Sequence, residues 1–100
     1  MATFPVLDEH SAAHVAELFR AFSDTSRVRI LSALAGGELN VSALAQLAGI
    51  SESAVSHHMR SLRQMQIVQA RRDGKEVYYR MEDAHLIALF RQGVDHIQQG

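Results

Sequence analysis

Four residues near the end of the chain carry side chains that can bind a metal ion. They are Asp83, His85, His96 and Gln99. His85 and His96 are eleven residues apart, so one helix would place them on nearly the same face but about 16 Å apart along its axis. Zinc–nitrogen bonds are only about 2 Å long. One helix therefore cannot place both imidazoles on one ion. Two antiparallel copies can, which would give two equivalent sites between subunits.

The local spacing of these residues sets a second condition. Asp83 and His85 are two residues apart and would point away from each other inside a regular helix. They converge only if Asp83 lies at the non-helical edge of the first turn. His96 and Gln99 are three residues apart and can share a face. The alternative is that all four are ordinary surface polar residues of an amphipathic helix.

A second chemically distinctive stretch runs from Ser51 to Arg63. Ser51 is a good helix N-cap, because its hydroxyl can accept a backbone N–H left free in the first turn. The apolar residues of the stretch have the spacing of one buried helix face. The opposite face carries hydroxyls, imidazoles and guanidinium groups, which can bind base edges and phosphates in a major groove. The alternative is a solvated polar face. The apolar residues are Val55, Met59 and Leu62, and the outward-facing residues are Ser53, Ser56, His57, Arg60 and Arg63.

The neighbouring sequence favours DNA binding. Residues 41–48 predict a helix that Gly49 closes, so residues 41–63 read as a helix-turn-helix. Residues 67–72 and 75–81 then predict two strands joined by a type I′ turn at Asp73-Gly74. A hairpin over 67–81 with basic residues at its tip makes a wing that can follow the phosphate backbone. The alternative is an edge hairpin that charged residues protect from aggregation. The basic residues at the tip are Arg71, Arg72 and Lys75.

Three further helices complete the prediction. Apolar spacing predicts helices over residues 8–22, 24–35 and 83–98, after a loose N-terminus at residues 1–7. The last helix has a wide apolar band that needs a partner, and we expect a second copy of the chain, with the first helix helping. The expected fold is mainly α with a small β-hairpin. We expect one winged helix-turn-helix domain over residues 1–100 that dimerises through its N- and C-terminal helices, with the C-terminal dimerisation and metal helix at residues 83–99.

The composition and the distribution of charge favour some classes of function and exclude others. The chain has 100 residues, no cysteine and a net charge of −1. Residues 51–80 hold six basic and three acidic residues, whereas the rest holds four basic and eight acidic ones. This pattern directs one basic face toward phosphates.

No thiolate metal site exists, no apolar run can span a bilayer and no export signal is present. We expect a cytoplasmic protein without a membrane partner. No nucleophile and base occur in a catalytic arrangement, so no enzyme is expected.

Several linked motifs resemble the ArsR/SmtB family of winged-helix repressors. Residues 21–31 and 37–44 are similar to its opening helices, residues 50–62 to its recognition helix and residues 72–80 to its wing. The resemblance spans roughly residues 15–99. It implies a homodimer that binds double-stranded operator DNA and releases it when an inducer, often a metal ion, binds.

The resemblance also separates two kinds of sensing site. One needs cysteines where this chain has Asn40 and Ser42, so that site is absent. The other lies on paired C-terminal helices and uses an Asp-x-His pair together with a His and a His or Glu three residues later. Asp83, His85 and His96 match this pattern, with the first two from one subunit and the third from the other. Gln99 departs from it, and an amide oxygen is a poor zinc ligand. Water, the carboxylate of Gly100 or Asp95 are alternatives for the fourth ligand.

We therefore expect a metal-responsive homodimeric repressor that binds its operator when metal-free. Zinc suits the ligand set best; cobalt and nickel are alternatives, and His10 or His14 could add a nickel ligand. His58 follows the family pattern, with inward packing as the alternative. A repressor that answers a non-metal signal, or none, is the second interpretation. The third is a hydrolytic enzyme built on the histidines, and a pure dimerisation or adaptor module is favoured over that enzyme. The expected DNA-binding residues are Ser51, Ser53, Ser56, His57, His58, Arg60, Arg63, Arg71, Arg72 and Lys75.

Overall fold

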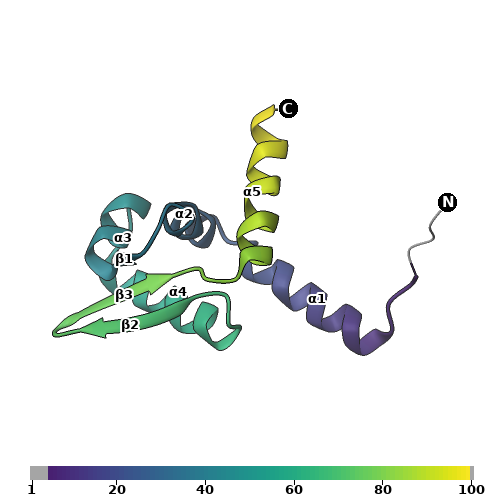
Figure 1. Cartoon of the computed structure of the whole chain (residues 1–100), viewed down its shortest axis with the longest axis horizontal. Coiled ribbons are helices and arrows are strands. Elements are labelled where there is room, and N and C mark those ends of the chain that lie inside the picture. Colours follow the sequence, from purple (N-terminus) through teal and green to yellow (C-terminus); the bar gives the residue numbers. More distant parts are fainter. Residues whose placement is uncertain (1–4, 100) are drawn as a thin grey trace.

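The computed structural model describes residues 5–99. Within this range the chain forms a helical body, a β-hairpin on one side and two helices that extend from the body (Figure 1). The elements are α1 (Glu9–Ala21), α2 (Thr25–Leu34), β1 (Leu39–Asn40), α3 (Val41–Ala48), α4 (Glu52–Gln64), β2 (Gln69–Asp73), β3 (Glu76–Arg80) and α5 (Ala84–Gln99). The expected mainly α winged helix-turn-helix fold is confirmed. The expected loose terminus at 1–7 lies partly outside the described residues, and residues 5–8 form no helix or strand.

Side-chain caps fix where the helices begin. The carboxylate of Asp24 accepts a hydrogen bond from the backbone N–H of Arg27 at 3.0 Å, and the amide oxygen of Asn40 accepts one from Ala43 at 2.8 Å. Ser51 caps α4 in the same way, as the sequence predicted. Each cap satisfies one of the backbone N–H groups that a helix start leaves unpaired. The helix starts were therefore predictable to within about one residue.

The core lies where α2, α3 and α4 meet. Ile30 and Leu31 of α2, Leu44 of α3, and Met59 and Leu62 of α4 are completely buried. Gly49 closes α3 in the left-handed conformation, with φ of 70°, which glycine adopts at no steric cost. The recognition helix α4 is therefore held from its inner side by the apolar faces of two other helices.

The wing predicted over 67–81 forms as β2 and β3. Strand β3 lies between β1 and β2 in a three-stranded antiparallel sheet. The predicted turn was wrong by one residue: Asp73 pairs with Glu76, so Gly74 and Lys75 make the two-residue turn. Only Gly74 has a positive φ, 63°, which is the pattern of a type II′ turn, because type I′ needs two such residues. Asp73 therefore extends its strand, and Lys75 lies at the tip.

The two outer helices bury little of their apolar surface. Among the described residues, α1 buries only Ala21 and α5 only Phe90. Phe19 is 52% exposed and Ile97 77% exposed. The rings of Phe22 and Phe90 meet edge to face, with centroids 6.2 Å apart, and join α1 to α5 where the helices leave the body (Figure 1). None of the helices within residues 5–99 has the length and apolar character needed to cross a membrane.

Leu62 and Leu47 provide a matched test of this core. Leu62 is completely buried, whereas Leu47 is 57% exposed. Leu62→Ala should lower the free energy of unfolding by about 2–5 kcal/mol, because it leaves a cavity beneath α4. Leu47→Ala should change it by no more than about 0.5 kcal/mol. Urea unfolding at one fixed protein concentration measures both, and equal effects would contradict the assigned core.

Candidate DNA-binding surface and metal-binding residues

The outer face of α4 presents the predicted polar side chains to solvent. Ser53, Ser56, His57, Arg60 and Arg63 are all exposed, because Val55, Met59 and Leu62 turn the opposite face into the core. The hydroxyl of Ser51 already accepts the N–H of Ala54 at 3.0 Å. Ser51 therefore acts first as the cap of the helix, although its side chain stays at the surface.

A shallow polar depression borders this face. It has a volume of about 420 Å³ and lies between α4 and the wing. Two guanidinium groups of α4 line it, and each can donate several hydrogen bonds in a planar fork that suits a phosphate. The lining residues are Ser56, Arg60, Arg63, Gln64 and Tyr79.

His58 differs from its neighbours because it points into the protein. Its side chain is only 16% exposed. The Nε of Arg27 donates a hydrogen bond to His58 Nδ1 at 3.1 Å, so the imidazole must be neutral, with its proton on Nε2. That Nε2 lies 4.0 Å from a carboxylate oxygen of Asp24. His58 therefore joins the recognition helix to the start of α2, in agreement with the inward alternative.

The electrostatic setting of His58 favours its neutral form. Burial lowers the pKa of His58 below its ordinary value of 6.5, the carboxylate of Asp24 acts in the opposite direction, and Arg27 and His57 lower it further. The desolvation of a charged imidazole is the largest of these effects.

Arg71 also has a partner within the protein. Its Nη2 and Nε donate to the two carboxylate oxygens of Glu38, at 2.6 and 3.2 Å. Arg72 and Lys75 are exposed at the tip of the wing and have no such partner among the described residues. The sequence did not reveal that Glu38 binds Arg71, because the two residues are 33 positions apart. The one sequence feature that could have suggested a structural role for Glu38 is its position directly before the short strand Leu39–Asn40.

The structure brings Asp83 and His85 together. Asp83 directly precedes α5, and its Oδ1 accepts the backbone N–H groups of His85 and Leu86 at 2.8 and 3.3 Å. The Nδ1 of His85 lies 3.5 Å from the same oxygen, and the His85 side chain is fully exposed. The convergence required by the spacing argument therefore occurs, and the helix start produces it.

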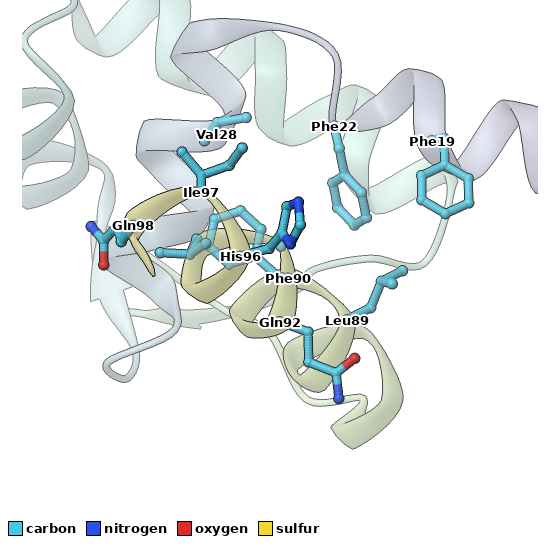
Figure 2. A pocket seen from close by; sticks show the side chains of 11 residues that line it. Phe19, Phe22, Val28, Leu89, Phe90, Gln92, His96, Ile97 and Gln98 are labelled. Atoms are coloured by element: carbon cyan, nitrogen blue, oxygen red, sulfur yellow. The ribbon is translucent and has the colours of Figure 1, made fainter. Parts of the chain in front are cut away.

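His96 lies far along the same helix, in an apolar setting. It borders an open groove of about 720 Å³ between α1 and α5, and Figure 2 shows Phe19, Phe22, Phe90 and Ile97 around it. Asp95 and Gln99 are exposed on α5, and Gly100 lies outside the described residues. Within residues 5–99 of one chain, no three His, Asp or Glu side chains come together in a way that could hold an ion. Within one chain, Asp83 and His85 thus lie beside each other at the start of α5, and His96 lies apart from them near its end.

The order and geometry of these elements agree with comparisons to known proteins. Residues 24–70 match the model for bacterial regulatory proteins of the arsR family. The chain is 46% identical to the transcriptional repressor SmtB homolog of Synechocystis sp. over 94 residues, which covers 94% of this chain and 71% of that protein. The chain belongs to the arsR family. It is therefore a winged-helix transcriptional regulator and not an enzyme.

One further sequence relative and one solved structure are also similar to this arsR-family chain. It is 36% identical to the cadmium resistance transcriptional regulatory protein CadC homolog of Staphylococcus aureus, over 90% of this chain and 75% of that protein. The homodimeric winged helix-turn-helix DNA-binding domain of Mb0332 from Mycobacterium bovis superposes with a TM-score of 0.78 at 28% identity, over 97% of this chain and 96% of that one. The family match runs from Asp24, the cap of α2, to Ala70 within β2, and so ends before Asp83.

The position of His58 predicts a pH dependence of stability. Because its folded pKa is lowered, its contribution is complete above the ordinary value near 6.5 and is lost as the pH falls through the lower folded pKa. His58→Gln keeps an acceptor for Arg27 but cannot be protonated, so its unfolding free energy should fall less than that of the native chain on acidification. Urea unfolding of both proteins at a series of pH values from above 6.5 downward measures the difference between their unfolding free energies. An NMR titration midpoint for His58 at or above 6.5 would contradict the assignment.

Proposed function

We propose that the protein is a metal-responsive transcriptional repressor. In this proposal a homodimer binds double-stranded operator DNA when metal-free and releases it when zinc binds. The observation that carries the proposal is the pair Asp83 and His85, which converge at the exposed start of α5 while the remaining candidate imidazole lies at the far end of the same helix. Such a repressor works in the cytoplasm, with the DNA.

The apolar surface of the outer helices supports the homodimer. Phe19 of α1 and Ile97 of α5 are largely exposed and border one groove. A contiguous apolar patch of this kind marks an interaction surface. A second α5 running antiparallel along it would place His96 of that copy beside Asp83 and His85 of the first, and the twofold axis would repeat the arrangement.

The half of the ligand set in one chain suits a divalent ion. Asp83 Oδ2 is free of the capping hydrogen bonds, which Oδ1 accepts, and His85 is fully exposed. Zinc bound there would supply bonds between the two chains and so fix their relative position. Cobalt suits the same ligands, and nickel would need more of them. Gln99 is the weakest member of the set, and water, Asp95 or Gly100 remain alternatives to it.

The recognition surface follows from the exposed residues. Ser53, Ser56 and His57 are the proposed contacts to base edges or nearby phosphates. Arg60, Arg63, Arg72 and Lys75 are the proposed phosphate contacts, because their side chains are exposed on α4 and at the wing tip. We assign Ser51, His58 and Arg71 to holding these elements in place, since each already has a partner in the protein.

Metal binding would then act through the distance between the two recognition helices. Each α4 enters a major groove, and the half-sites of an operator lie about one helical turn apart. Fixing α5 against its partner changes the spacing or tilt of the two α4 helices. Allosteric couplings of about 1–3 kcal/mol are typical and are enough to reduce operator occupancy severalfold or more.

A repressor without a metal signal is the second candidate. The observation that favours it is Gln99, whose amide stands where the family pattern has an imidazole or a carboxylate. In that case the same surface binds DNA, and zinc has no effect on it.

Zinc titration of operator binding separates the two candidates. With an operator selected from random duplex DNA, saturating zinc should weaken binding by the native protein by about 10-fold or more. His96→Ala should bind the operator equally well without zinc and lose the response. His14 is a candidate ligand for nickel only, so His14→Ala is the matched histidine control and should respond to zinc like the native chain. Unchanged binding with zinc, cobalt and nickel all saturating would contradict metal sensing.

A further inference from the structure

We propose that Glu38 is a positioning residue for DNA binding, which holds the wing in place by binding Arg71 across the sheet. The proposal rests on the DNA-binding function proposed above. It assigns a role to an acidic residue on a surface that otherwise attracts phosphates. It also reassigns Arg71 from a DNA contact to a structural link.

The two residues belong to opposite edges of the sheet. Strand β3 lies between β1, which Glu38 directly precedes, and β2, which carries Arg71. Arg71 pairs with Tyr78 of β3, and its guanidinium lies over the Tyr78 ring, 4.7 Å from the centroid. The side chain of Arg71 therefore crosses the central strand over an aromatic ring and reaches the carboxylate on the far side.

The contact is a two-pronged one. Two N–H groups of Arg71 donate to the two oxygens of Glu38, which is the most directional ion pair that side chains form. Arg80 lies 4.0 Å from the same carboxylate and 3.5 Å from Glu82. The hydrogen bond from Arg71 is the main reason that the pKa of Glu38 lies below its ordinary value. Glu38 is therefore charged throughout the pH range in which histidines titrate.

The strand pairing that attaches the wing to the body on this side is short. Strand β1 is two residues long and pairs only Leu39 with Tyr79 and Asn40 with Tyr78. A two-stranded hairpin alone is at best marginally stable in water. The Glu38–Arg71 contact adds a link from the loop after α2 directly to β2, the outer strand. It thereby restricts the direction in which the tip, with Arg72 and Lys75, points.

Simple electrostatics and the positioning role predict opposite changes in DNA affinity when the charge of Glu38 is removed. If Glu38 acted only as a negative charge near DNA, its removal would free Arg71 and strengthen binding. If Glu38 positions the wing, its removal lets the tip move, and DNA binding must then pay the cost of ordering it. Glu38→Gln should therefore weaken operator binding.

The test compares two isosteric substitutions on the same surface. Glu38→Gln should weaken binding to the selected operator by about 3- to 10-fold at fixed salt and should raise the amide exchange rates of residues 69–80 in the free protein. Glu76→Gln removes an acid that makes no ion pair among the described residues, so it should leave wing exchange unchanged and binding unchanged or slightly tighter. The double exchange Glu38→Arg with Arg71→Glu should restore binding that each single exchange weakens.

The outcomes separate this proposal from the one it rests on. Faster wing exchange together with weaker binding in Glu38→Gln supports the positioning role. Unchanged wing exchange, or binding that is equal or tighter, overturns it. Failure of the native chain to select any operator would refute the DNA-binding proposal itself, whereas the exchange rates, which need no DNA, still report whether Glu38 holds the wing.

Discussion

The structure depends on a constraint that one chain cannot satisfy. Helices α1 and α5 carry apolar faces that cover each other only in part, so Phe19 of α1 and Ile97 of α5 remain exposed. Helix α5 holds its candidate metal ligands at opposite ends, with Asp83 and His85 at the start and His96 near the end. An antiparallel second copy would resolve both problems at once, because it would cover the apolar face and bring the two ligand groups together. Dimerisation and metal binding are therefore proposed to share one surface.

Helix α2 and the loop that follows it organise the DNA-reading elements. Arg27 at the start of α2 binds His58 of the recognition helix, and Glu38, after the end of α2, binds Arg71 of the wing. Both partners are residues that a sequence pattern assigns to DNA contact, because an imidazole on the recognition helix and a basic residue on the wing look like ligands for phosphate. In the structure a hydrogen bond holds His58 and an ion pair holds Arg71. The exposed residues around them are the proposed DNA contacts.

The sequence predicted most of the fold because its signals are local. The N-caps Asp24, Asn40 and Ser51 and the closing glycine Gly49 set helix ends through contacts within a few residues. The turn of the wing was placed one residue early, because Asp-Gly is a common turn pair while the pairing of Asp73 with Glu76 is decided by strand register. The roles of Glu38 and Arg27 were out of reach, since their partners lie 33 and 31 residues away. From the sequence, Asp83 and His85 could converge only if Asp83 lay at the non-helical edge of the first helical turn. In the structure Asp83 directly precedes α5.

Mixed dimers test the central claim that the ligands come from two chains. One protomer carries Asp83→Ala and His85→Ala, and the other carries His96→Ala, with different affinity tags so that the heterodimer can be purified. The heterodimer keeps one complete set of these three ligands, contributed by both chains, whereas neither homodimer keeps a complete set. Zinc titration calorimetry should therefore give one tightly bound ion per heterodimer and no comparable binding by either homodimer. A heterodimer that binds no zinc, or a homodimer that binds as the native protein does, would contradict the account.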